Sequence, residues 1–175
     1  TGALFSGLVS GSFWSLSPVF GRDIGLDNSA VASFIVVTVA GGALLQWPIG
    51  WLSDRFDRRH LLAFTSFGAS LAMAGMAYWS LSASIGLLVA AFLFGGFSFS
   101  LYGLSVAQTH DHFLQHVVLE ATRGVLLMHV IGAAIGPVIT GFAMSSLTGG
   151  FAISLAVLFV ALCVFVSLLL RLYAP

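Results

Sequence analysis

The chain has 175 residues, of which 59% are hydrophobic and 7% are charged, and its six arginines and six acidic residues give a formal net charge of zero. Soluble domains carry about 25% charged residues, so this composition excludes an ordinary globular domain. The chain has no lysine and its arginines are few, which excludes a basic surface for nucleic acid. Its single cysteine, Cys163, excludes an intrachain disulfide.

Long stretches without charge set the number of helices. A helix needs about 20 apolar residues to cross a hydrocarbon core roughly 30 Å thick. Residues 1–21 and 28–53 each allow one crossing. Residues 60–110 and 124–170 contain no Asp, Glu, Lys or Arg, and as single helices they would be about 77 and about 70 Å long. Each of these two stretches therefore holds two crossings.

Small and hydroxyl residues mark the two internal breaks, SLSASIG at residues 80–86 and LTGG at residues 147–150. The uninterrupted apolar runs do not alternate as the strands of a membrane barrel would. We therefore expect an all-α membrane protein, a six-helix bundle. The expected helices are 2–20, 30–52, 60–81, 85–107, 120–146 and 151–171.

The arginines predict the orientation in the membrane. Five lie on one side of the expected bundle and only Arg22 lies on the other. The five are Arg55, Arg58 and Arg59 of the second loop, Arg123 of the fourth loop and Arg171 near the C-terminus. Because cytoplasmic loops are enriched in arginine, both ends of the chain are expected in the cytoplasm. The chain starts at a threonine and lacks a basic leader, so we expect it to be a piece of a longer protein.

The stretch GWLSDRFDRR between the second and third expected helices carries the sharpest motif. Gly50, Asp54, Arg55, Arg58 and Arg59 have the spacing G-x-x-x-D-R-x-x-R-R. This order resembles motif A of the major facilitator superfamily. A glycine lets two helices approach closely, and an aspartate can sit against a helix N-terminus and an arginine.

Three segments extend the resemblance over nearly the whole chain. ALLQWPIGWLSDRF, LYGLSVAQTHD and RGVLLMHVIGAAIGP follow in the order found in the C-terminal half of the YcaD-type branch of that superfamily. Asp57 departs from the pattern, since the superfamily often has glycine there. The resemblance implies helices seven to twelve of a transporter in a bacterial inner membrane, completed by an N-terminal six-helix half. It also implies that the third and sixth helices lie on the outside.

His129 is the strongest candidate for a functional residue. It lies nine residues after Glu120, about 13 Å along the helix and close to the middle of the membrane, among Val, Leu, Met and Ile. An imidazole at this depth can bind substrate or carry a proton, because its pKa lies near physiological pH. The alternative is a histidine that is simply hydrogen-bonded to a neighbouring helix.

Four other side chains at comparable depth are candidates for substrate binding: Trp14, Gln46, Ser98 and Tyr102. Ser98 and Tyr102 are four residues apart and share one helix face. Together the candidates predict a mostly aromatic site with few hydrogen-bonding groups. For each residue taken singly, core packing is the competing interpretation.

Gly132, Gly136 and Pro137 interrupt the fifth expected helix. Small residues allow close helix packing, and proline frees a carbonyl group and bends the helix. The pattern fits a bend that serves alternating access and equally fits a static kink at a tight crossing.

Every acidic residue falls at or outside an expected membrane boundary, so this half offers no buried carboxylate for coupling protons. Coupling would have to use His129 or the other half. Arg123 can pair with Glu120 one turn before it, or with Asp54 across the cytoplasmic face, and so close a gate. A metal site is not expected, although His110, His112 and His116 are loosely spaced, because no further ligand beyond Asp111 lies near them.

The sequence therefore predicts a transporter of a small neutral or amphipathic solute, not an enzyme. It has no phosphate-binding loop and no nucleophile with an orienting base, and no cofactor is expected. Its expected partners are the lipid bilayer, the solute, and the missing half or a second copy of the chain. A membrane anchoring or sensing module with a transporter-like fold is the alternative.

Overall fold

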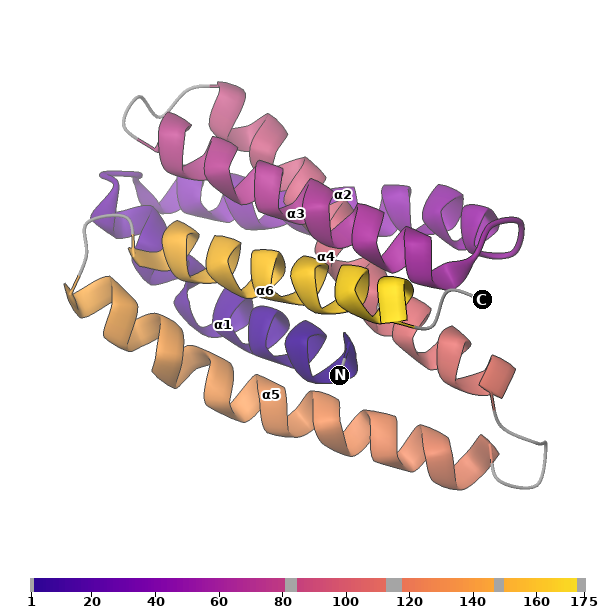
Figure 1. Ribbon diagram of the computed structural model, residues 1–175. Helices are drawn as coiled ribbons and strands as arrows, with labels where there is room; N and C mark the ends of the chain where they lie inside the picture. The colour runs from indigo at the N-terminus through magenta and orange to yellow at the C-terminus, as the bar shows by residue number, and fades with distance from the viewer. Residues whose placement is uncertain (1, 81–84, 113–117, 147–149, 173–175) are drawn as a thin grey trace.

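Six helices make up the computed structural model, which describes residues 2–80, 85–112, 118–146 and 150–172 (Figure 1). No strand occurs in these ranges. The helices are α1 (Gly2–Asp23), α2 (Asn28–Ser53), α3 (Arg58–Trp79), α4 (Ile85–His112), α5 (Val118–Ser146) and α6 (Gly150–Leu172). The expected all-α six-helix fold is confirmed.

Five helices, α1 to α5, are long and apolar enough to cross a membrane. In α6 the apolar stretch Gly150–Val166 covers the residues whose side chains the structure describes. The helices flanking the two expected breaks end at Trp79 and at Ser146, and parts of both breaks, residues 81–84 and 147–149, lie outside the described residues.

A short turn joins α1 to α2. Gly25 has a φ of 82°, which a residue without Cβ adopts without strain. Asp27 caps α2, and its carboxylate accepts hydrogen bonds from the Ala30 N–H at 2.9 Å and the Ser29 hydroxyl at 3.0 Å. These bonds, the one from the Ala30 backbone first, lower the pKa of Asp27 below its usual value.

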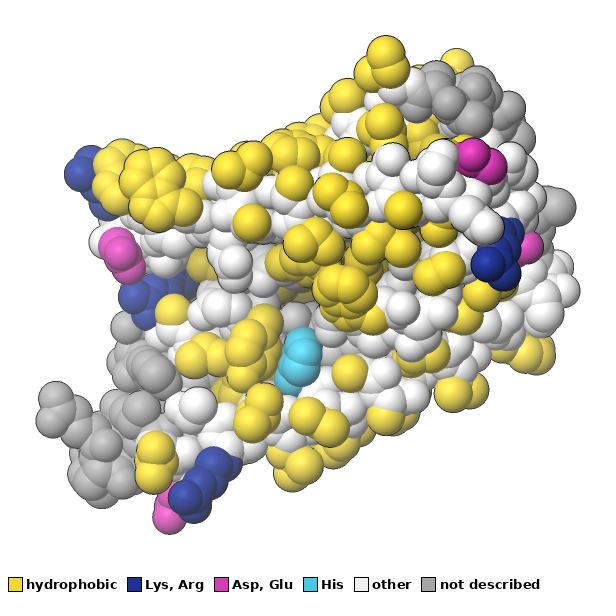
Figure 2. Space-filling view, turned by 180° about the vertical axis from the view of Figure 1, so that it is seen from behind, with side chains coloured by type: hydrophobic (Ala, Val, Ile, Leu, Met, Phe, Trp, Pro, Cys, Tyr) yellow, Lys and Arg dark blue, Asp and Glu magenta, His cyan; other side chains and the backbone are white. Residues whose placement is uncertain are grey.

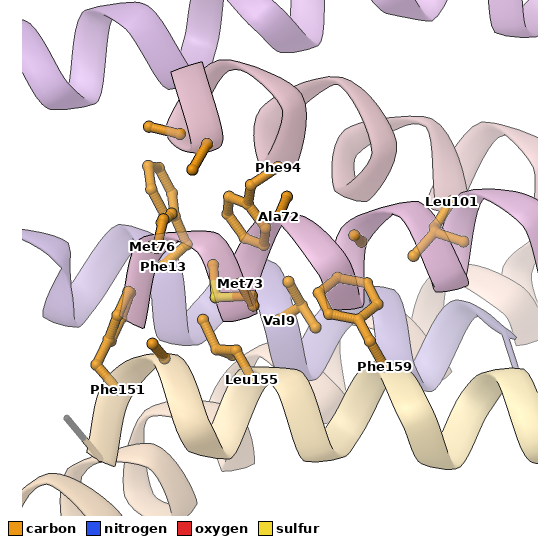
Figure 3. Packing of buried hydrophobic residues seen from close by; sticks show 14 of the residues in the cluster. Val9, Phe13, Ala72, Met73, Met76, Phe94, Leu101, Phe151, Leu155 and Phe159 are labelled. Carbon is orange, nitrogen blue, oxygen red and sulfur yellow. The ribbon is translucent and has the colours of Figure 1, made fainter. Parts of the chain in front are cut away.

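The apolar core lies where α6 meets α3, α4 and α1 (Figure 3). Phe151, Leu155 and Phe159 of α6 point towards Met73 and its neighbours on α3. Phe159 also meets the ring of Phe94 on α4, with the ring centres 6.0 Å apart. One face of α6 is thus fully buried, while its opposite face stays exposed. The exposed side chains include Ile153, Val157, Val160 and Val164.

Glycines bring α1 and α5 into backbone contact. A Cβ atom on Gly7 would fall on the carbonyl oxygen of His129, and one on Gly132 would fall on the carbonyl oxygen of Leu4. Gly136 faces the Leu8 carbonyl in the same way. Within a membrane, such close approaches take the place of the hydrophobic effect in holding helices together, and they bring Cα–H groups onto carbonyl oxygens.

The crossing of α2 with α4 repeats this pattern. A Cβ atom on Gly41 would fall on the carbonyl oxygen of Phe92, and one on Gly95 would fall on that of Thr38. Both crossings are reciprocal. Each glycine lies against a carbonyl oxygen of the partner helix, and the partner's own glycine lies three residues after the residue that supplies this oxygen. Two glycine-lined seams, α1 with α5 and α2 with α4, therefore organise the bundle.

Pro137 is built into the α1–α5 seam. As a proline it cannot donate to the carbonyl of Ala133 four residues earlier. The carbonyl oxygen of Ala133 faces Gly11, and a Cβ atom on Gly11 would collide with this oxygen. Beyond it, the buried Thr140 hydroxyl donates to Ser12 Oγ at 2.9 Å, and so continues the seam with an interhelical hydrogen bond.

The seam predicts opposite effects for two glycines of α5. Gly132→Ala places a methyl group on the Leu4 carbonyl, and the backbone must move, so we expect a loss of about 1–3 kcal/mol of stability. Gly141→Ala meets nothing within 4 Å and should be neutral or stabilising by up to about 1 kcal/mol. Unfolding of the full-length protein in detergent measures both variants, and equal stability of the two would contradict the role of the seam.

Candidate functional site

A polar cluster lies where α4 meets α5. The rings of Tyr102 on α4 and His129 on α5 are 4.6 Å apart between centres and tilted by 56°. Ser98 precedes Tyr102 by one turn on the same face of α4 and is only 4% exposed. The structure thus brings Tyr102 and His129 together, and Ser98 lies one turn before Tyr102 on α4.

Two atoms of this cluster lack a hydrogen-bond partner. Among the described residues, Ser98 Oγ and His129 Nδ1 are the buried side-chain nitrogen or oxygen atoms without one. Such an atom costs about 1–3 kcal/mol when it is buried unpaired. The expected alternative for His129, a hydrogen bond to a neighbouring helix, is therefore not made through Nδ1.

An aromatic pair lies next to the cluster. Trp14 of α1 stacks on Phe99 of α4, with ring centres 6.2 Å apart and planes 12° from parallel. Phe99 is three residues before Tyr102, and its ring also meets Phe13 edge-on at 5.9 Å. Trp14 is 57% exposed, so one face of the pair is open at the surface of this six-helix body.

Gln46 does not join the cluster. Its side chain is exposed on α2, and it forms no hydrogen bond with any residue in the described part of the chain. It lies about 10 Å from the end of α2 at Ser53, closer to the loop than the other candidates.

Charged side chains lie at the two ends of the molecule (Figure 2). In this view a histidine side chain occupies the hollowed middle of one face, between arginine and acidic groups at either end. The charged residues nearest to His129 along α5 are Arg123 and Glu120, about 9 and 13 Å away along the helix axis. The middle of this face is therefore largely apolar and shows no described Asp, Glu, Lys or Arg side chain.

At one end of the bundle, Arg58 links three helices. Its guanidinium donates to the Ala107 carbonyl of α4 at 2.5 Å and to the Ser53 carbonyl of α2 at 3.4 Å. It also lies 3.6 Å from the carboxylate of Asp54. The Arg58 side chain is 22% exposed, whereas that of Asp54 is 75% exposed. The backbone contacts of Arg58 are therefore the better shielded part of this cluster.

Two other residues of the motif, Gly50 and Arg55, lie outside this cluster. Gly50 is exposed and has nothing within 4 Å of its Cβ position, so the close helix approach expected there is not made within the described residues. Arg55 instead lies over the ring of Trp51, 3.9 Å from its centre, in a cation–π contact. The sequence pattern marks both residues but does not show which way each points.

The expected gate pair at the start of α5 is also absent. Glu120 and Arg123 are both exposed, and neither forms an ion pair with another residue that the structure describes. Glu120 lies in the first turn of α5, where the helix dipole already favours a negative charge. Asp54 pairs with Arg58 and not with Arg123.

Some predicted residues lie outside what the structure describes. They are His116 and the side chains of Arg59, Arg171, His110, Asp111 and His112. Within the described residues, no group of three or more His, Cys, Asp or Glu side chains gathers as a metal site would.

Sequence reasoning missed three contributors. Gly7 and Gly11 of α1 meet α5, and Phe99 joins Trp14 to the cluster. The G-x-x-x-G spacing of Gly7 and Gly11, matching that of Gly132 and Gly136, was the available signal.

Comparison with known proteins gives the family. The sequence profile of the Major Facilitator Superfamily matches residues 1–175. Relatives named uncharacterized MFS-type transporter YcaD occur in Escherichia coli strains UMN026, E24377A and K12 DH10B, each 30% identical over 145 residues. These residues cover 83% of this chain, and the match spans 37% of the length of these curated relatives. Together with the six-helix fold, the match over the whole chain shows that this integral membrane protein belongs to the major facilitator superfamily of transporters.

Proposed function

We propose that the chain is the C-terminal six-helix half of a secondary transporter in a bacterial inner membrane, with both ends of the fragment in the cytoplasm. The transporter moves a small neutral or amphipathic solute by alternating access, together with an N-terminal six-helix half, and catalyses no covalent chemistry. The observation that carries this proposal is the meeting of α1, α4 and α5 at mid-depth. Two buried polar atoms without a partner, Ser98 Oγ and His129 Nδ1, lie on the same helices as the ring contacts of Trp14 with Phe99 and of Tyr102 with His129.

The exposure of α2 and α5 supports a second six-helix body. Only 17% of the most apolar stretch of α5 and 28% of that of α2 are buried, against 50% in α1 and in α4. In α3, which packs against α6, 44% of the corresponding stretch is buried. A second bundle resting on α2 and α5 would cover their free sides and enclose the aromatic face between them.

The charge distribution supports secondary transport through an uncharged cavity. The acidic side chains described lie at helix ends, so a buried carboxylate for cation coupling would have to come from the other half.

Arg58 is proposed as part of a latch at the cytoplasmic end. Its bonds tie the start of α3 to the end of α2 and to α4, so these helices move together as long as Arg58 is in place. The exposed Asp54 carboxylate and the open space at Gly50 leave a surface on which the other half can rest when the cytoplasmic side is closed.

Alternating access predicts that Trp14 becomes reachable from both sides of the membrane. In a cysteine-free version of the full-length protein, Trp14→Cys should react with an impermeant methanethiosulfonate in both inside-out and right-side-out vesicles. Val160→Cys, exposed on the outer helix α6, should react in neither because it faces lipid. Labelling of Trp14→Cys from one side only would favour a fixed membrane anchor.

The latch predicts a difference between two arginines. Arg58→Gln removes the bonds to the Ala107 and Ser53 carbonyls and should cost about 1–3 kcal/mol of stability. It should also raise labelling of Trp14→Cys from the cytoplasmic side. Arg55→Gln loses an exposed contact with Trp51 and should cost no more than about 1 kcal/mol. Equal labelling in the two variants would remove Arg58 from the latch.

A further inference from the structure

The unpaired atoms of the polar cluster are unusual within this bundle. Several buried hydroxyls elsewhere donate to the carbonyl four residues earlier, as Ser66, Ser70 and Ser100 do at 2.7, 3.0 and 2.8 Å. Ser98 is equally buried and makes no such bond. Its hydroxyl and the Nδ1 of His129 are therefore left for a group that the described part of the chain does not supply.

The neighbouring rings indicate what else the missing group carries. Trp14 and Phe99 stack in parallel, and the exposed indole of Trp14 offers a flat apolar surface. Tyr102, one turn beyond Phe99 on α4, meets the imidazole of His129 and adds a second ring contact, between α4 and α5. Planar solutes gain most from such surfaces, because stacking adds to the burial of apolar area.

Charge restricts the solute further. The described charged side chains lie at the helix ends, so an ionic solute at mid-depth would find no counter-charge in this half. Burying an ion without a partner is far more costly than burying a neutral polar group. The site therefore favours a solute without net charge.

We propose that Ser98, Tyr102 and His129, with the adjacent Trp14–Phe99 pair, bind an uncharged aromatic solute that carries a hydrogen-bonding group on its ring edge. The ring lies on the aromatic surfaces, and the edge group pairs with Ser98 Oγ and His129 Nδ1. This inference rests on the proposed transport function and names the class of solute for that site.

Four small probes test the proposal by calorimetric titration of the full-length protein in lipid nanodiscs. Indole offers a ring N–H donor, isoquinoline offers a ring acceptor, indene has neither, and indole-3-carboxylate carries a charge. We expect indole or isoquinoline to bind at least about tenfold more tightly than indene, as loss of one hydrogen bond predicts. We expect indole-3-carboxylate to bind more weakly than indole. Failure of both indole and isoquinoline to bind, or equally tight binding of indene, would overturn the proposal.

Two serines of α4 provide matched variants. Ser98→Ala should weaken binding of the preferred probe about tenfold and leave indene unchanged. Ser100→Ala should leave the binding of both unchanged, because that hydroxyl already pairs with the Gly96 carbonyl. His129→Leu should act as Ser98→Ala does. Ser98→Ala should also unfold at the same or a higher temperature than the unsubstituted protein, since it removes an unpaired buried group. Equal binding by the two alanine variants would contradict the assignment.

The outcome is separable from that of the transport proposal. If Trp14→Cys is labelled from both sides but neither indole nor isoquinoline binds, alternating access stands and the solute class is wrong. If the probes bind as expected but labelling occurs from one side only, the site is a binding site of a protein that does not transport.

Discussion

The contact between glycine and carbonyl groups at the two helix crossings is the constraint on which the rest of the structure depends. In a bilayer, apolar side chains gain little by leaving lipid for one another, so helices associate through close packing and polar contacts. At the α1–α5 seam, Gly7 lies against the carbonyl of His129 itself. The backbone of the main candidate site residue is therefore fixed by the packing, and its imidazole is carried towards Tyr102 on α4.

The two seams relate the halves of the chain to each other. Gly7 and Gly132 at one seam correspond to Gly95 and Gly41 at the other, so α1 corresponds to α4 and α5 to α2. This is the relation expected of the three-helix repeats nested within each half of such transporters. The repeat places Thr38 where the first seam has His129. Thr38 is fully buried and bonds to the Phe34 carbonyl of its own helix, whereas the imidazole leaves its Nδ1 unpaired. The candidate site thus lies at a position where the two repeats carry different side chains, His129 in one and Thr38 in the other.

The helix count followed from the sequence because charge is so costly in lipid that the gaps between charged residues mark the crossings. Contacts between helices did not follow in the same way. The four-residue spacing of Ser98 and Tyr102 predicts a shared face, yet nothing in the sequence shows that Ser98 lacks a partner while Ser100 has one. The pairing of Tyr102 with His129 depends on where α4 meets α5. Gly50 was expected to let two helices approach closely, and none of the described residues fills its Cβ position, because a glycine in a motif does not show which helix it faces.

Pro137 links the seam to the site. Pro137 has no N–H to donate to the carbonyl of Ala133, so a change of bend at this point breaks no hydrogen bond from residue 137 and alters the contact of that carbonyl with Gly11. His129 lies one turn before Ala133, with its carbonyl on Gly7 and its ring in the polar cluster. The seam that holds α1 and α5 together therefore also fixes how far the imidazole of His129 lies from the proline of α5.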